Sequence, residues 1–187
     1  MKLKRICMIG IAVSGCLLGN AQEARVESSV WGVQVGMMSV WGYNELRLTD
    51  AVALRSEIGL AGSFFYSYTT WFGSISGFDA YSLTPGIAVE PRWYYDLARR
   101  HSAGKRTLYN SGNYFSLKTS LYSKELTIGN THPVPTHMTI VPMWGLRRHF
   151  GTHFSVEAGA GVGYLHTFSK RRDECVIRGH LRIGYTF

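Results

Sequence analysis

The sequence predicts an all-β protein, an eight-stranded antiparallel up-and-down β-barrel that follows a cleaved leader. Segments with an apolar residue at every second position recur from residue 31 to the last residue, and turn-forming residues separate them. The positions between those apolar residues carry many charged side chains. The chain begins with a short apolar run behind basic residues, and no later segment has the roughly 18 consecutive apolar residues of a membrane-spanning helix.

We interpret residues 1–21 as a signal peptide. Residues 2–5 hold three basic side chains, and residues 6–18 form an apolar run that is too short to cross a bilayer as a helix. Residues 19–21 provide the small side chains that a signal peptidase requires, so we expect cleavage before Gln22. The alternative of a lipoprotein leader stays open, because a lipobox match would make Cys16 a lipidated N-terminus.

The remaining chain, residues 22–187, is long enough for one domain, the barrel. Its formal net charge is +5 instead of the +8 of the whole chain, because the leader holds three basic residues and no acidic one. This modest basic excess fits contact with anionic lipid and gives no reason to expect nucleic acid. Cys175 is the single cysteine of residues 22–187, so we expect no internal disulfide and interpret it as an apolar filler.

Residues 31–37 and 40–48 form the first two predicted strands. Apolar residues occupy mainly odd positions in the first stretch and even positions in the second. This change of parity requires either a bulge within one strand or a tight turn near Ser39 between two strands. The turn brings the total to eight, and an even number places both chain ends at the same end of a barrel.

The other predicted strands follow at regular intervals, and none of them repeats with the three- and four-residue spacing of a helix. Pro142 lacks a ladder donor and is a local departure in its strand, tolerable at a bulge. These strands comprise residues 52–66 after a turn at 49–51, residues 81–95, residues 114–121, residues 140–146, residues 154–164 after a turn at 149–152, and residues 175–187 after a polar loop at 169–174.

The charged face distinguishes a membrane barrel from a soluble one. A soluble eight-stranded barrel of the lipocalin kind is apolar inside, and a cavity for an apolar ligand would not be lined by charges. In a bilayer, each Arg or Lys facing lipid near the centre costs roughly 2–4 kcal/mol. We therefore predict a transmembrane β-barrel whose charged face points inward. The predicted interior charge network contains Glu45, Arg47, Arg55, Glu57, Glu90, Arg92, Lys118, Arg147, Glu157, Arg178 and Arg182.

Aromatic residues gather near both predicted rims of the barrel. Membrane barrels carry aromatic girdles at the two interfaces, although the general preference of aromatic residues for strands is an alternative explanation. The predicted girdle near the chain ends contains Trp93, Tyr95, Trp144, Tyr185 and Phe187, and the opposite girdle contains Phe64, Tyr66, Tyr81 and Tyr164.

The last strand resembles the C-terminal signal of Gram-negative outer-membrane barrels, which the barrel assembly machinery recognises. Leu181, Ile183, Tyr185 and Phe187 alternate with other residues, and the last one is aromatic. In addition, Glu90-Pro91-Arg92-Trp93-Tyr94-Tyr95, a basic turn and Ser111-Gly112-Asn113-Tyr114 are similar to the outer membrane protein β-barrel domain family, within the OmpA/OmpX-like class. The resemblance implies an integral protein of the outer membrane, with periplasmic termini, surrounded by outer-membrane lipid and lipopolysaccharide, and it carries no catalytic motif.

The predicted interior favours a structural role over transport. Eight strands enclose a space that side chains can just fill, and buried charges must be paired or hydrated. We therefore expect a salt-bridged plug with an excess of positive charge. A narrow, gated, anion-preferring pore, in which the salt bridges exchange partners, is the alternative.

Residues with catalytic or metal-binding chemistry have no spacing that selects a site. His149 and His153 flank a turn, which supports a metal site only weakly. His132, His137 and Asp79 would suit a lipid-modifying hydrolase or acyltransferase, but catalytic triads are recognised by geometry. We expect no enzyme activity, no metal and no cofactor.

Two longer segments between predicted strands remain to be interpreted. Residues 67–80 are rich in aromatic residues and glycine, and we place them outside the cell, either as a binding surface or against the barrel rim. Residues 97–110 are basic, and we interpret them as a solvated periplasmic turn that can meet inner-leaflet head groups. The predicted function is a small outer-membrane barrel with a plugged interior, acting structurally or through extracellular loops of unknown ligand.

Overall fold

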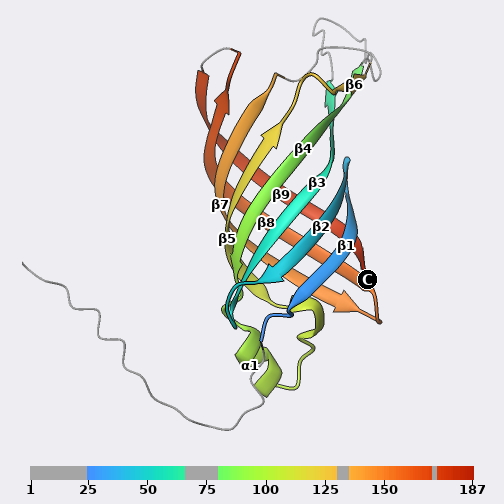
Figure 1. The fold of residues 1–187 in the computed structure, drawn as a ribbon, viewed down its shortest axis with the longest axis vertical. Helices are drawn as coiled ribbons and strands as arrows, with labels where there is room; N and C mark the ends of the chain where they lie inside the picture. The colour runs from blue at the N-terminus through green and yellow to red at the C-terminus, as the bar shows by residue number, and fades with distance from the viewer. Residues whose placement is uncertain (1–24, 66–79, 130–134, 170–171) are drawn as a thin grey trace, which may run out of the picture.

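The computed structural model describes residues 25–65, 80–129, 135–169 and 172–187 and consists of one closed antiparallel barrel (Figure 1). Consecutive barrel strands pair with each other, and β1 pairs with β9 to close the ring. The barrel strands are β1 (Ser29–Gly36), β2 (Ser39–Arg47), β3 (Val52–Phe65), β4 (Ala80–Trp93), β5 (Asn113–Tyr122), β7 (His137–Phe150), β8 (Phe154–Thr167) and β9 (Arg172–Thr186). The short β6 (Ile128–Gly129) adds to the edge of β4.

The predicted fold class is thereby confirmed as far as an eight-stranded, antiparallel, up-and-down, closed barrel. The change of parity in the first stretch comes from a two-residue turn, Met37–Met38, between β1 and β2. The predicted signal peptide at residues 1–21 and most of the loop at residues 67–80 lie outside the described residues.

The strand has no bulge at Pro142. Ile140 faces Tyr164 and Met143 faces Gly161, so the register between β7 and β8 keeps one constant offset across the proline and no residue is inserted. The pairing of the two strands is interrupted between these positions, because a proline has no N–H to donate to the ladder. A missing hydrogen bond is therefore tolerated without a change of register.

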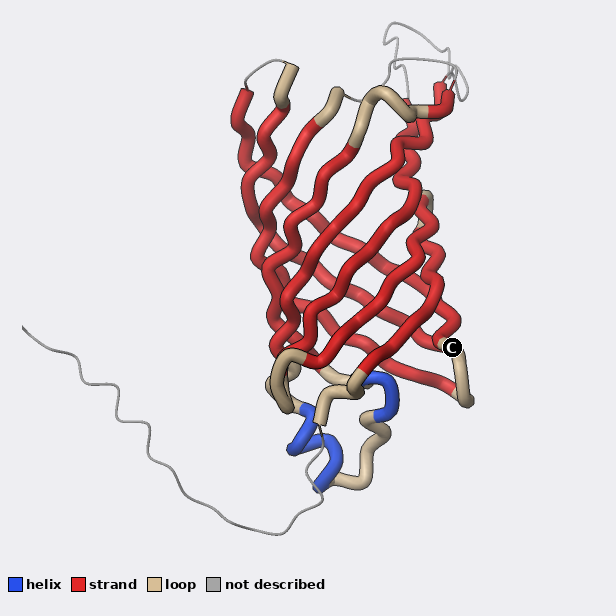
Figure 2. The backbone as a smooth tube through the Cα atoms, viewed as in Figure 1, coloured by secondary structure: helices blue, strands red, loops and turns tan. Residues whose placement is uncertain are grey.

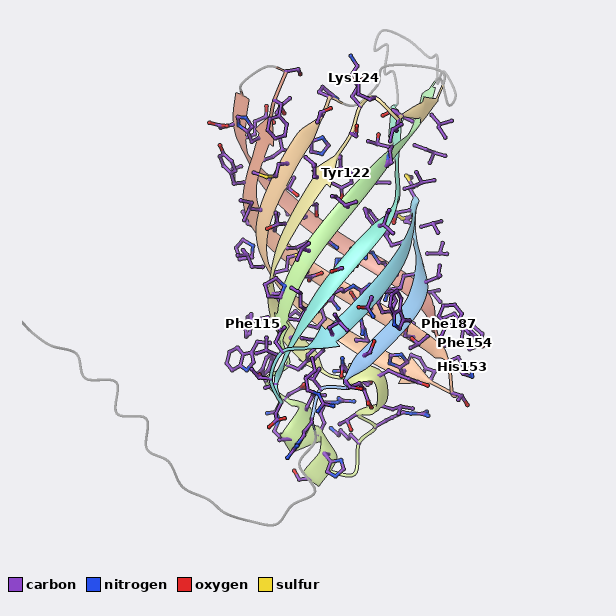
Figure 3. All side chains as sticks on the ribbon, viewed as in Figure 1. Phe115, Tyr122, Lys124, His153, Phe154 and Phe187 are labelled. Carbon is purple, nitrogen blue, oxygen red and sulfur yellow. The ribbon has the colours of Figure 1, made fainter. Side chains whose placement is uncertain are left out.

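The barrel wall is apolar outside and polar inside. Along β1, for example, Trp31, Val33 and Val35 are exposed, whereas Gly32 and Gln34 between them are buried. Strict alternation produces this division, because neighbouring side chains of a strand point to opposite faces. Figure 3 shows side chains standing outward along the whole height of the wall.

A helical segment lies under one end of the barrel, here called the helix end (Figure 2). It contains α1 (Leu97–Ser102) and the 3₁₀ turn η1 (Leu108–Asn110). The interpretation of residues 97–110 as a solvated turn is therefore wrong in part, because Leu97 and Asn110 are buried. A small apolar core anchors the segment, and it consists of Val26, Ala53, Tyr94, Leu97 and Tyr114. No helix among the described residues is long and apolar enough to cross a membrane.

Candidate functional site

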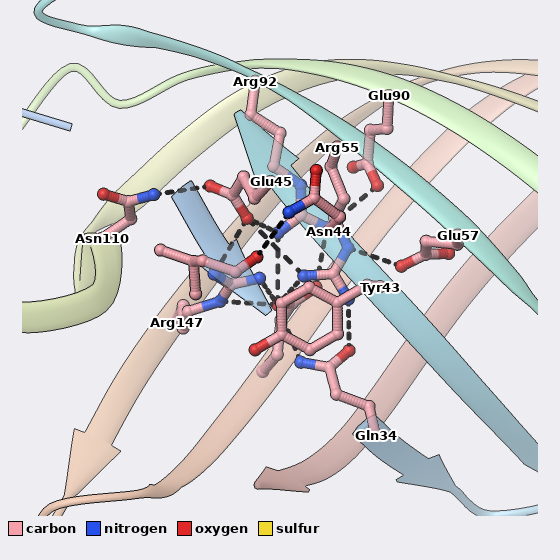
Figure 4. A network of polar contacts seen from close by, with 12 residues as sticks. Gln34, Tyr43, Asn44, Glu45, Arg55, Glu57, Glu90, Arg92, Asn110 and Arg147 are labelled. Carbon is pink, nitrogen blue, oxygen red and sulfur yellow. Dashed lines mark hydrogen bonds and ion pairs between the residues drawn. The ribbon is translucent and has the colours of Figure 1, made fainter. Parts of the chain in front are cut away.

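The candidate site is a cluster of charged side chains inside the barrel (Figure 4). Four buried carboxylates come from β2, β3, β4 and β8, and five basic side chains from β3, β4, β5, β7 and β9 surround them. The strand register prepares their contacts, because Glu45 lies opposite Arg55. Glu157 lies between Arg147 on one neighbouring strand and Arg182 on the other. The nine members are Glu45, Arg55, Glu57, Glu90, Arg92, Lys118, Arg147, Glu157 and Arg182.

Glu157 is the centre of this network. Its carboxylate accepts from Arg92 Nη2 at 2.8 Å and from Arg147 Nε at 2.9 Å. Tyr114 donates its hydroxyl proton to Oε1 at 3.1 Å, and Gln34 Nε2 donates to Oε2 at 3.2 Å. The carboxylate thus has several charge-assisted partners while it is fully withdrawn from solvent, which is the condition for a buried charge to be tolerated.

Glu45 connects the network to the helix end. Arg147 Nη1 donates to Oε2 at 2.9 Å, while Tyr94 donates its hydroxyl proton to Oε1 at 2.7 Å. The side-chain amide of Asn110, in η1, donates to the same Oε1 at 2.9 Å. The helical segment therefore contacts a buried carboxylate of the barrel interior directly, through Asn110.

Tyr94 lies just beyond the end of β4, and its pKa is raised well above the usual value. Burial is the largest cause, since it disfavours the phenolate, and the negative charge of Glu45 adds to it. Tyr94 therefore stays protonated and remains a hydrogen-bond donor under ordinary conditions.

The other two carboxylates form the upper layer of the network, away from the helix end. Glu57 accepts from Arg55 Nε at 2.6 Å and from Arg182 Nη1 at 2.8 Å, and it also pairs with the ammonium group of Lys118. Glu90 accepts from Arg92 Nη2 at 2.9 Å. Arg55 and Arg92 thus contact carboxylates of both layers, since each also reaches Glu157.

Aromatic faces cover the guanidinium groups. Arg55 lies 3.8 Å from the ring centroid of Tyr43, and Arg92 lies 4.2 Å from that of Tyr114, in the range of cation–π contact. Gly145 on β7 makes room for Tyr114, because a Cβ at this position would overlap the phenol ring. The large inward side chains are thus accommodated by the smallest residue on a neighbouring strand.

Two predicted members lie outside the network. Arg47 is exposed at the last position of β2, beyond the part of the strand whose inward side chains are enclosed. Arg178 is half-buried further along β9 and makes no ion pair within the described part of the chain. Its side chain borders a cavity instead.

Several polar members of the site were absent from the predicted set. Gln34, Tyr114 and His180 stand at inward positions of their strands, so alternation alone could have identified them. Asn110 could not have been found in this way, because it belongs to the helical segment and has no strand parity.

The cavity lies next to the upper layer and has a volume of about 700 Å³. Lys118, Arg178 and Arg182 contribute its basic groups, and Trp41 and Met143 contribute apolar surface. Its volume is within the range of about 300–1,000 Å³ that is typical of small-molecule sites.

The histidines considered for metal binding have other contacts. His149 Nε2 lies 3.0 Å from the hydroxyl oxygen of Thr186, and His153 Nδ1 lies 2.9 Å from its carbonyl oxygen. His137 Nδ1 lies 2.8 Å from the carbonyl oxygen of Pro135. Among the residues that the structure describes, no three His, Cys, Asp or Glu side chains are grouped to hold a metal ion. His132 and Asp79 lie outside the described residues.

Exposed aromatic side chains cluster on the outer wall near the helix end. Tyr95 and Phe115 are 5.2 Å apart between ring centroids, and the indole of Trp144 donates to the hydroxyl of Tyr95 at 2.9 Å. Around the ring, Tyr185 lies 5.5 Å from Phe187. Figure 3 shows Phe115, Phe154 and Phe187 at a similar level on both sides of the barrel. At the opposite rim Tyr164 is exposed, and the side chains of Phe64, Tyr66 and Tyr81 are not among those described.

Comparison of the chain with protein-family models, with curated proteins and with solved structures gave no match.

Proposed function

We propose that the chain is an integral β-barrel of the outer membrane of a Gram-negative bacterium, similar in kind to the OmpA/OmpX-like class. In this proposal its interior is closed by the charge network, so that it acts structurally or through the loops at the end opposite the helices. The observation that carries the proposal is the inverted wall: the exposed outer face is apolar while the enclosed face is charged.

The outer face supports a lipid environment. Ile58, Ile177 and Leu181 expose 69%, 80% and 65% of their surfaces on the outer wall. A wall of this kind in water would leave a continuous apolar surface far beyond the few hundred Å² that soluble monomers expose. The aromatic cluster near the helix end fits a membrane interface, where aromatic side chains are enriched.

The inner network supports a closed interior. In the ring of eight strands, β8 lies opposite β3 and β7 lies opposite β2. Arg55 of β3 reaches Glu157 of β8 at 3.4 Å, and Arg147 of β7 reaches Glu45 of β2 at 2.9 Å. Ion pairs therefore connect opposite walls, and the side chains between them occupy the cross-section.

The orientation follows from the same proposal. The helix end, with its basic residues Arg99, Arg100 and Arg106, faces the periplasm, and the opposite loops face the outside. The outward residues Leu181, Ile183, Tyr185 and Phe187 of the last strand then serve as the signal for the barrel assembly machinery. Residues 1–21 act as the export signal that brings the chain to this machinery.

Two measurements on the same sample test this function. The chain is expressed in a Gram-negative host, extracted from the membrane fraction and examined by gel electrophoresis with and without heating, and then by single-channel recording in a planar bilayer. We expect a mobility shift on heating, which reports a closed barrel, and no conductance steps. Absence from the outer membrane would contradict the location. Steady anion-selective steps that change in Arg92→Gln would contradict the plug and make the narrow pore the better interpretation.

A further inference from the structure

The barrel wall is low on one side. The strands β1 and β2 have eight and nine residues, whereas the neighbouring β3 and β9 have 14 and 15. The pairing of β1 with β9 ends at Gly36 and Arg182, so residues 172–181 of β9 face no strand on this edge among the described residues. Figure 1 shows that the β1–β2 hairpin stops below the far ends of the flanking strands. Above the turn Met37–Met38, the wall therefore has a notch.

The cavity opens through this notch. Its border includes Arg182, which points inward, and also Leu181 and Ile183, which point outward on either side of it. The cavity also borders both strands that flank the gap, at Ala61 and Gly62 of β3 and at Gly179 and His180 of β9. The turn residues Met37 and Met38 complete the rim. The cavity thus connects the barrel interior sideways with the outer, apolar surface.

The rim and the floor of the cavity differ in chemistry. Val35, Met37 and Met38 are exposed at the rim and are apolar and, in the two methionines, flexible. At the floor, Trp41 has two cations near its ring, Lys118 at 5.8 Å and Arg182 at 5.3 Å from the centroid. A ligand that spans this space meets hydrocarbon at one end and positive charge at the other.

The interior holds more positive charge than its carboxylates neutralise. Arg178, half-buried beside the cavity, has no ion pair in the described part of the chain. Arg182 is 6% exposed, and its Nε is buried without a hydrogen-bond partner. A buried guanidinium with unused donors is stabilised by an anion. The six inward basic residues Arg55, Arg92, Lys118, Arg147, Arg178 and Arg182 stand against the four carboxylates Glu45, Glu57, Glu90 and Glu157.

The geometry points to a binding site for a single-chain anionic lipid, whose carboxylate or phosphate contacts Arg178 and Arg182 while its acyl chain leaves through the notch over Met37 and Met38. Guanidinium groups recognise both kinds of anion through paired N–H donors. The acyl chain passes from the cavity to the outer wall without crossing the closed network below. This site rests on the proposed location in a membrane, because only there does the notch face lipid.

Equilibrium binding to the membrane-inserted barrel tests the site. The protein is extracted from the membrane fraction, its heat-dependent mobility is checked, and it is reconstituted in phosphatidylcholine nanodiscs free of single-chain detergent. Radiolabelled palmitate, 1-palmitoyl lysophosphatidate and the uncharged hexadecanol are titrated separately. Arg178→Gln removes the cation without breaking an ion pair of the described structure, Arg178→Lys restores the charge, and the exposed Arg47→Gln is the matched control.

We expect saturable binding of at least one of the two anionic lipids and at least tenfold weaker binding in Arg178→Gln, because a charge-assisted contact is lost. Arg178→Lys should recover part of the affinity, and Arg47→Gln should match the parent protein. Met38→Glu, which places a negative charge at the rim, should also weaken binding. The preferred probe identifies the head group.

Hexadecanol binding as tight as that of the anionic lipids, or equal affinities of Arg178→Gln and the parent protein, would overturn the site. If the barrel is inserted in the membrane but binds none of the probes, the lipid site is contradicted and the proposed function is not. A chain that never enters the membrane rejects the proposed function as well, so the two failures can be distinguished.

Discussion

The two halves of the barrel interior are built from the same alternating strands, yet one half holds a network of paired charges and the other holds a cavity. Toward the helix end, Glu45, Glu157 and Arg147 meet at 2.8–2.9 Å, and Tyr94 and Asn110 donate hydrogen bonds to Glu45 from below. Toward the loop end, the side chains leave a cavity of about 700 Å³ with Arg178 beside it. Alternation decides which residues point inward, but it does not decide whether they fill the interior.

The difference has two physical causes. The filled half brings long side chains of opposite sign from facing strands to the same level, so that their charges neutralise one another. The hollow half has shorter inward residues, such as Ser120 and Thr139, and its wall is interrupted above β1 and β2. Paired charges therefore occupy the first half, while the second half holds a cavity beside the gap above β1 and β2.

The largest expected effect comes from Glu157→Gln, which removes the central charge of the filled half. Arg92 and Arg147 then lose their shared buried partner, and breaking such a pair typically costs about 3–5 kcal/mol. Guanidinium unfolding of the protein in lipid vesicles, followed by the mobility shift, measures the loss. Glu125→Gln is the control, since Glu125 is exposed between β5 and β6. Equal stabilities of the two variants would contradict the central role of Glu157.

Tyr94→Phe tests the hydrogen bond between Tyr94 and Glu45 at the helix end. The substitution removes the hydroxyl that donates to Glu45 at 2.7 Å, and a buried hydrogen bond to a charged group contributes about 1.5–3 kcal/mol. We expect a loss of this size in the same unfolding assay at neutral pH. A change below about 0.5 kcal/mol would show that Asn110 and Arg147 suffice for Glu45.

Alkaline pH should reduce the difference between the parent protein and Tyr94→Phe. The pKa of Tyr94 is raised in the folded state, so its contribution is complete below the unfolded value of about 10 and declines above it. The stability of the parent protein should fall relative to the variant by about 1.4 kcal/mol per pH unit over that range. Unfolding curves of both proteins between pH 8 and about 11.5 measure the difference, and parallel pH dependences would be inconsistent with a buried, protonated Tyr94.

The smallest effect is expected in the hollow half. Thr139 lines the cavity, and its hydroxyl makes no hydrogen bond in the described part of the chain. We therefore expect Thr139→Val to change the free energy of unfolding by no more than about 0.5 kcal/mol. The same unfolding assay applies. A loss as large as that of Tyr94→Phe would mean that both halves are equally well filled, and the comparison between them would fail.

Much of the fold could be predicted, because strand alternation and turn chemistry are local properties. The parity change near Ser39 left a bulge or a turn, and the even strand number of a barrel favoured the turn that divides the first stretch into β1 and β2. How the strand accommodates Pro142 could not be predicted, since a missing N–H can be absorbed by an interrupted ladder as well as by a bulge. The burial of Asn110 and Leu97 could not be predicted either, because a basic, polar segment carries no periodic signal for the surface that it will cover.

The sequence by itself determined which face of each strand is charged, and therefore which residues were candidates for the interior. Register and strand length, which arise only when distant segments meet, decided how they were used. Ring closure brought Arg55 to Glu157 across the barrel, while the end of β2 left Arg47 exposed. The short β1–β2 hairpin left Arg178 beside an open cavity. Local periodicity decides the direction in which each side chain points, but the distance between two charges is a property of the assembled barrel.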